Sequence, residues 1–197
     1  LSRCQIYDFK RITISDIQEQ LKKIAEKESI LYEDDALYLI AQKADGALRD
    51  ALSIFDRLST FSHKNITLAK AAEVLNILDY DQYLNIVDLA KENNIPATLS
   101  AFNEIVKKGF DSHTFIAGLG NHFRDLMMAQ NTTTIDLIEV GDQTKAKFAE
   151  QAKSWSPQSL IDSIEICNHA DINYKNSKNP RLTVEIALMQ LSSLTSG

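Results

Sequence analysis

The chain has 197 residues, 44% of them hydrophobic, so it is long enough for one large or two small domains with real cores and is not a disordered tail. Acidic residues outnumber basic ones by 27 to 21, and the net charge of -6 excludes an overall positive field that would attract nucleic acid or an anionic membrane. Cys4 and Cys167 lie far apart and support neither a disulfide framework nor a zinc site.

Apolar residues follow a helical spacing through nearly all of the chain after Ser15. Only six glycines and three prolines occur, so the sequence predicts an all-α fold, with residues 5–12 as the one stretch that could be extended. Ser15 and Gln18 fit a capping box, which predicts a helix beginning at Ser15. Two further helices are expected at 34–44 and 46–61, and the three helices together predict a small bundle.

The third of these helices carries a cation in its first turn. Asp45 is placed to cap the helix, and Arg49 faces the positive end of the helix dipole, which costs up to about 1 kcal/mol when nothing compensates it. On one interpretation Arg49 pairs with Asp45 one turn back, a contact worth only about 0.3 to 0.5 kcal/mol. On the other, the guanidinium and the free N–H groups of the helix end together contact a phosphate.

A short polar link at 62–66 leads into a larger helical region. Its expected helices span 67–78, 81–93, 95–109, 112–130, 157–174 and 180–194, with a less regular stretch at 131–155. Asn179 should cap the last helix, and Pro180 should occupy its first position, where a missing N–H costs nothing.

The last helix is apolar around most of its circumference. Such a helix must be buried on more than one side, and the second side can be covered either by its own neighbours or by another subunit. Periodicity alone leaves both possibilities open. The apolar residues are Leu182, Val184, Ile186, Ala187, Leu188, Met189, Leu191 and Leu194.

No residue pattern indicates an independent enzyme. The histidines, at 63, 113, 122 and 169, have no nucleophile or metal-ligand partner at a telling interval, and the chain lacks a G-x-x-x-x-G-K-[ST] phosphate loop. Gly118 and Gly120 lie inside a helical pattern, while Asp34 and Asp35 suit a helix start rather than a catalytic pair. Since no apolar run could cross a membrane and no signal peptide is evident, we expect a soluble, cytoplasmic protein without a metal site.

Four stretches of the sequence resemble segments of one family. G-A-L-R-D-A-L-S at 46–53 resembles the sensor-2 helix in the lid of AAA+ ATPases, and more narrowly that of the gamma/tau subunit of bacterial DNA polymerase III, the clamp-loader motor. L-S-R-C-Q at 1–5 resembles the clamp-loader S-R-C motif, and N-P-R-L-T-V-E at 179–185 resembles the N-P-R-L-x-x-E signature of the last collar helix. Residues 122–126 are similar to a mid-collar segment. Asn76 departs from the family, which usually has glycine there.

This resemblance implies roles for individual residues. Arg49 would be the sensor-2 arginine, reaching from the lid to the phosphates of ATP, with Gly46 and Leu48 beside it at the nucleotide. Arg3 would be the catalytic arginine finger, acting in trans on the ATP site of a neighbouring subunit. ATP with Mg would be the cofactor of the longer parent protein, and the fragment alone should hold neither tightly. The expected subunit-interface residues are Arg181, Leu182, Glu185, Leu188 and Met189.

The resemblance also implies a division into domains. Residues 1–12 would be the tail of an AAA+ ATPase domain, 13–62 a three-helix lid, and 63–197 a larger helical collar that joins clamp-loader subunits. The expected partners are the delta and delta-prime subunits and further gamma/tau copies, with the sliding clamp and primed DNA reached through the assembled complex. Because the chain starts without methionine and without a phosphate loop, we expect a fragment with no ATPase activity of its own.

Two other readings remain open at this point. The chain could be the lid and oligomerisation region of another clamp-loader-like AAA+ protein, such as the delta-prime subunit or a replication-restart ATPase. Delta-prime is not expected to keep a working sensor-2 arginine, so G-A-L-R-D favours the motor subunit. Alternatively, the chain could be a helical scaffold without any link to nucleotide, which would leave the joint placement of Arg3 and Arg49 unexplained.

Overall fold

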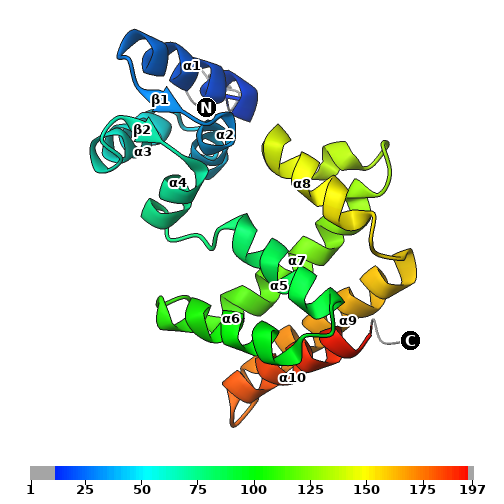
Figure 1. Ribbon diagram of the computed structural model, residues 1–197. Coiled ribbons are helices and arrows are strands. Elements are labelled where there is room, and N and C mark those ends of the chain that lie inside the picture. Colours follow the sequence, from blue (N-terminus) through cyan, green and yellow to red (C-terminus); the bar gives the residue numbers. More distant parts are fainter. Residues whose placement is uncertain (1–11, 195–197) are drawn as a thin grey trace, which may run out of the picture. The chain divides into compact units, whose positions relative to one another are not determined.

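The computed structural model describes residues 12–194, and these fold almost entirely into α-helices, which confirms the predicted all-α class. The described residues form two compact units that divide between Ile77 and Leu78 (Figure 1). The stretch at 5–12, the one that could be extended on sequence grounds, lies outside the described residues, apart from Ile12.

The first unit contains four helices and two very short strands. The strands β1 and β2 pair in parallel, with Leu31 opposite Asn65, which brings the connection between α1 and α2 beside the chain that leaves α3. The elements are α1 (Ile14–Lys27), β1 (Leu31–Tyr32), α2 (Asp34–Lys43), α3 (Leu48–Phe61), β2 (Asn65–Ile66) and α4 (Leu68–Val74).

The start of α1 corrects the predicted cap. Thr13, not Ser15, is the N-cap residue, and its Oγ1 accepts a hydrogen bond from the Asp16 amide at 3.1 Å. The same hydroxyl donates to Asp16 Oδ2 at 2.6 Å. An acidic side chain in the first turn therefore completes the cap and also complements the helix dipole, so the helix begins one residue earlier than the sequence pattern suggested.

One core holds the first unit together, and it extends past the expected lid border at residue 62. Ile66 and Ala71 are fully buried in it, so α4 packs with the first three helices even though the sequence assigned it to the second domain. The packing divides at Ile77 instead, and the functional domain borders remain a prediction. The largest other side chains of this core are Ile17, Leu21, Leu37, Ile40, Phe55 and Leu58.

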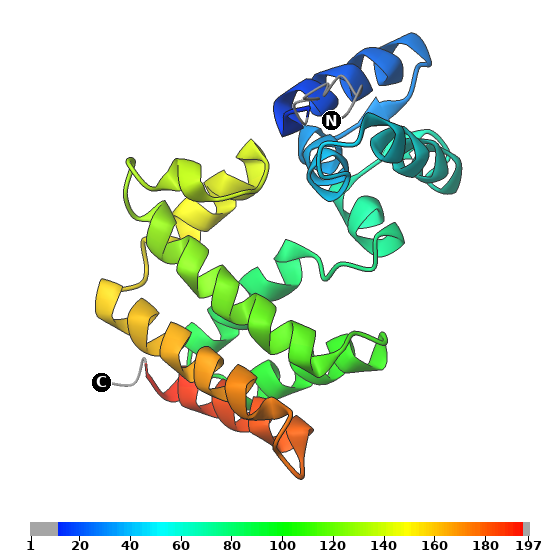
Figure 2. The same ribbon diagram turned by 180° about the vertical axis from the view of Figure 1, so that it is seen from behind.

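The second unit is built around the long helices α7 and α9, which lie side by side in Figure 2, with α10 packed along α9 and against α5 and α6. Its predicted helices all form, and the Gly118–Gly120 pair lies inside α7 as expected. The elements are α5 (Tyr80–Lys91), α6 (Ile95–Lys107), α7 (Ser112–Ala129), the 3-10 turn η1 (Ile135–Leu137), α8 (Asp142–Ala152), α9 (Pro157–Tyr174) and α10 (Pro180–Ser193).

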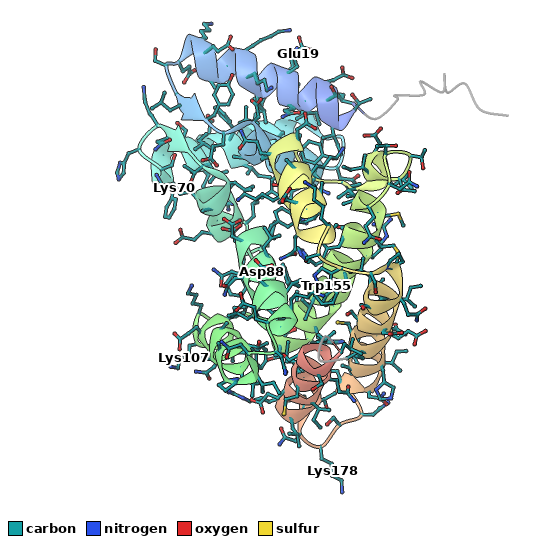
Figure 3. The ribbon with its side chains drawn as sticks, turned by 45° about the vertical axis from the view of Figure 1, so that its right-hand side comes forward. Glu19, Lys70, Asp88, Lys107, Trp155 and Lys178 are labelled. Atoms are coloured by element: carbon teal, nitrogen blue, oxygen red, sulfur yellow. The ribbon has the colours of Figure 1, made fainter. Side chains whose placement is uncertain are left out.

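Helix α8 lies within the stretch that the sequence pattern left irregular. It carries few apolar residues, and Phe148 is the large side chain that it buries. A polar network adds to its attachment, because Gln151 donates from Nε2 to the Leu84 carbonyl and to Asp88 Oδ1, both at 2.8 Å. Figure 3 labels Asp88 on α5. Since the amide nitrogen is committed to these acceptors, Gln151 Oε1 accepts the proton of His122 Nε2 at 2.8 Å.

His122 is consequently a core residue that links α7 to α8. Burial lowers the pKa of His122 to about 4, and the hydrogen bond that its Nε2 donates to Gln151 and the charge of Asp88 offset only part of that effect. The imidazole therefore stays neutral at physiological pH, with Nδ1 buried and unpartnered within the described part of the chain. Its ring lies 4.7 Å from that of Phe148 in an edge-on contact.

Candidate functional site

The connection from α2 to α3 sets up the first candidate site. Asp45 and Gly46 both adopt left-handed backbone conformations, with φ of 46° and 82°, and they turn the chain sharply into α3. Asp45 therefore does not cap the helix, as the sequence had suggested. Ala47 is the N-cap residue instead, and it provides no side-chain hydrogen bond to the helix start.

The first turn of α3 thus presents unshielded N–H groups. The earliest backbone hydrogen bonds of the helix are donated by Asp50 and Ala51 to the Ala47 carbonyl, both at 3.1 Å, so the preceding amides point out of the helix end. Asp50 in the same turn offsets part of the dipole. An end of this kind, capped by alanine, attracts an anion.

Arg49 is exposed at this helix end. None of the ion pairs found among residues 12–194 includes its guanidinium, so the expected pair with Asp45 does not form. Leu48 next to it is partly buried and packs against the core of the first unit, which fixes the turn from which Arg49 projects. The structure therefore brings Gly46, Leu48 and Arg49 together in one turn, while Arg3 lies outside the described residues.

The rest of α3 is a rigid support for that turn. Ala51, Phe55 and Leu58 are buried on its inner face, against α1 and α2. The charged side chains lie on the opposite face, where Arg57 is exposed two turns beyond Arg49. The geometry can therefore hold a guanidinium and the amide donors of Leu48 and Arg49 at a fixed place, and this combination suits a phosphate group.

The second candidate site lies on α10, whose start is built as the sequence predicted. Asn179 Oδ1 accepts a hydrogen bond from the Leu182 amide at 3.2 Å, and Pro180 occupies the first helical position. Val184 and Leu191 are fully buried on the inner face, whereas Leu182 and Ile186 are each 44% exposed. The chain's own core therefore covers only one of the two apolar sides of α10.

Not all of the expected interface residues lie on the outer face of α10. Leu188 is fully buried in the core of the second unit, because it follows Val184 by one helical turn on the inner face. Met189 is partly exposed. The Arg181 Nε donates to Glu185 Oε1 at 2.8 Å, and its Nη2 donates to Asn103 Oδ1 on α6 at 2.9 Å, so both charged residues already have partners within the chain.

A shallow depression, apolar in one part and more polar in the other, runs between α9 and α10. One part of it has a volume of about 460 Å³, and an adjoining part of about 330 Å³ shares Ile166, Ile186 and Gln190 with it. Met189 and Leu194 line the first part. The exposed Ile186 therefore forms the edge of a groove that could receive side chains from another protein.

Other kinds of site are not found in the part of the chain that the structure describes. No group of three or more His, Cys, Asp or Glu side chains could hold a metal ion there. Over the same residues, no helix is both long and apolar enough to cross a membrane. Sequence reasoning missed Asn103, because its partner Arg181 lies 78 positions further along the chain, and it also missed Ile166 on the α9 side of the groove.

Two family models match the chain in succession. The DNA polymerase III clamp loader subunit ATPase lid domain matches residues 16–63, and domain III of the DNA polymerase III subunits gamma and tau matches residues 66–197. The second match alone covers more than half of the chain.

Individual relatives agree with these family matches. The chain is 30% identical over 194 residues to the DNA polymerase III subunit tau of Bacillus subtilis, an alignment that covers 97% of this chain and 34% of that protein. It is also 30% identical over 130 residues to the tau subunit of Escherichia coli, covering 66% of this chain and 20% of that protein. The chain thus spans about a third or less of the length of these relatives.

Two further similarities are broader. Protein STICHEL-like 2 of Arabidopsis thaliana is 30% identical over 197 residues, covering 100% of this chain and 22% of that protein. Among solved structures, the Bacillus subtilis DNA clamp loader delta protein aligns with a TM-score of 0.57 at 18% identity, over 94% of this chain and 58% of that one. This last similarity concerns the fold alone.

Proposed function

Because the chain belongs to the family of the DNA polymerase III gamma and tau subunits, we propose that it forms the nucleotide-sensing lid and the subunit-assembly collar of a clamp-loader motor. The complete motor would be a cytoplasmic protein that uses ATP to place a sliding clamp on primed DNA during replication. The succession of a lid match and a domain III match along one chain carries this proposal.

Arg49 is the proposed nucleotide sensor. Its exposed guanidinium and the uncapped amides of α3 would contact the phosphates of ATP, bound with Mg on an ATPase domain that this chain does not contain. Gly46 and Leu48 would hold the turn in place. Alanine as the N-cap residue supports this role, since a Ser or Asp at that position would satisfy the amides that the phosphate needs.

Arg3 is the proposed arginine finger, on the strength of the S-R-C resemblance. It would stabilise the charge that develops on the transferred phosphoryl group in a neighbouring subunit's ATP site. The chain by itself should therefore have no ATPase activity, because it contributes parts to two different sites and completes neither.

The outer face of α10 is the proposed assembly surface. Leu182, Ile186 and Met189 are at least partly exposed on it, and the groove beside α9 is largely apolar. Removal of this apolar area from water would drive association with delta, delta-prime and further gamma/tau copies. Ile161 and Ile172 on α9 are also exposed apolar side chains, but they do not line this groove.

The alternatives are less well supported. A lid and collar of another clamp-loader-like AAA+ protein would share the fold, as the delta protein does, but the match to gamma and tau domain III favours the motor subunit. A scaffold without a link to nucleotide would not need an exposed arginine at an uncapped helix end.

The nucleotide role can be tested in a longer protein that carries the ATPase domain together with this chain. Arg49→Ala should lower clamp-stimulated ATPase activity by at least tenfold, since a charge-assisted phosphate contact is worth about 1.5 to 3 kcal/mol. Arg57→Ala is the matched control, because it removes an exposed arginine from the same helix. If both variants kept equal and nearly full activity, Arg49 would be an ordinary surface residue without a role in nucleotide sensing.

A further inference from the structure

Helix α10 has two apolar faces on opposite sides. Val184, Leu188 and Leu191 point into the core, while Leu182, Ile186 and Met189 point outward. With about 100° of rotation per residue, the two sets are about half a turn apart and similar in size. Burial of apolar area therefore gives little preference for one rotation of this helix over the inverted one. A contact that depends on the orientation of the helix must decide between the two rotations.

Arg181 is placed to supply that direction. It lies on the flank between the two apolar faces, and its guanidinium makes hydrogen bonds in two directions, to Glu185 on the same helix at 2.8 Å and to Asn103 on α6 at 2.9 Å. Hydrogen bonds from a planar guanidinium depend on angle, whereas hydrophobic contact does not. Rotating α10 to its inverted position would break the bond to Asn103.

The acceptor on α6 is itself oriented. A guanidinium carries donors only, so the amide oxygen of Asn103, Oδ1, is the atom that faces Arg181, at 2.9 Å from Nη2. Hydrogen bonds thus connect Asn103 on α6 to Arg181 and, through it, to Glu185 on α10.

We propose that Arg181 is a positioning residue, which fixes the rotation of α10 through Asn103 and so determines which apolar face is presented to the next subunit. This inference rests on the proposed function of the outer face as the assembly surface. It differs from the sequence-based expectation, in which Arg181 and Glu185 contact a partner directly. Here the two charged residues act within the chain, and the apolar residues make the contact.

The test compares Asn103→Ala with Arg181→Ala. In the 197-residue chain alone, amide hydrogen exchange in the first two turns of α10 should become about three- to tenfold faster in both variants, in line with the loss of one partly exposed charged hydrogen bond. The double variant should add little to Arg181→Ala, because that change already removes the bond to Asn103. Lys178, which is labelled in Figure 3, is a nearby exposed cation, and Lys178→Ala should leave the exchange rates of α10 unchanged.

Assembly with the delta and delta-prime subunits of the same organism gives the second readout. Asn103→Ala and Arg181→Ala should weaken it by a similar factor, and Arg181→Lys should resemble Arg181→Ala, because an ammonium lacks the planar fork of donors. If Arg181→Ala disrupts assembly while Asn103→Ala leaves both readouts unchanged, Arg181 contacts the partner and the inference is wrong. The inference is equally wrong if neither variant changes exchange.

Ile186→Asp separates this inference from the proposed function. It places a charge on the outer face without touching the Arg181 bonds, so it should abolish assembly and leave exchange in the first turns of α10 unchanged. Assembly that survives Ile186→Asp would contradict the proposed assembly surface, while the exchange data would still decide whether Arg181 fixes the helix.

Discussion

The two units use their surfaces in opposite ways. In the first unit, the candidate site is a single exposed charge on a helix whose apolar side is buried, and the large exposed apolar side chains lie at the ends of elements or in β1. In the second unit, four of the five large exposed apolar side chains lie on α9 and α10. A lid that reads a small anion needs one fixed cation, whereas a collar that holds a protein needs apolar area.

The largest expected effect tests whether the two units are stabilised separately. Phe55→Ala in the first core and Phe102→Ala in the second each remove a side chain that is at most 1% exposed, and each should cost its own unit about 3 to 5 kcal/mol. Hydrogen exchange followed unit by unit in increasing urea measures this. Equal loss in both units from either substitution would show that they unfold as one, against the division at Ile77.

Acid should destabilise the second unit selectively. The folded pKa of His122 is about 4, below its ordinary value of 6.5, so the unfolded chain binds the proton first. The free energy of unfolding of the second unit should keep its full value above pH 6.5, fall by about 3 kcal/mol as the pH drops toward 4, and level off below that.

The control for the acid effect is His122→Gln, which should flatten the dependence between pH 6.5 and 4 because glutamine does not titrate. An unchanged pH profile in His122→Gln would mean that another group causes the acid effect.

A smaller effect is expected where α5 crosses α7. A Cβ on Gly118 would lie 2.0 Å from the Tyr83 hydroxyl, and Tyr83 is itself buried, so Gly118→Ala should destabilise the second unit by about 1 to 3 kcal/mol. Gly120→Ala is the matched control, because its Cβ would meet only Cys167 Cβ at 3.2 Å. Thermal unfolding of the two variants should differ clearly, and equal midpoints would contradict the close approach of Tyr83.

The smallest effect has opposite signs for stability and function. Ala47→Asp supplies the missing cap on α3 and should stabilise the first unit by about 0.5 to 1 kcal/mol. In the longer protein it should lower ATPase activity, because the new carboxylate occupies the amides and repels the phosphate. A variant that is both more stable and fully active would break the link between the uncapped helix end and nucleotide sensing.

Much of the fold was predictable from apolar spacing and caps. The pattern located nine of the ten helices found among the described residues, and Asn179 and Pro180 gave the start of α10 correctly. Helix α8 was missed because its attachment depends on Phe148 and on the polar contacts of Gln151 to α5 and α7. Such contacts join residues far apart in the chain and leave no local pattern.

The candidate sites were predicted in part. The sequence located Arg49 at the start of a helix, but it also suggested an Asp45 cap, because a left-handed backbone at that residue cannot be read from spacing. On α10, periodicity showed that two sides were apolar without showing which was inward, and the interface that the resemblance implied included Leu188, which is buried. The rotation depends on Asn103, which only the tertiary structure places beside Arg181.

If this chain contributes to two ATP sites at once, variants that each remove one contribution should complement each other. The ATPase activity of the longer protein should be compared for Arg3→Ala, Arg49→Ala and an equal mixture of the two variants, assembled with delta and delta-prime. The mixture should be more active than either variant alone, because one subunit supplies Arg3 to a site whose own Arg49 is intact. A mixture no more active than the better of the two variants would show that the two arginines do not act on each other's sites.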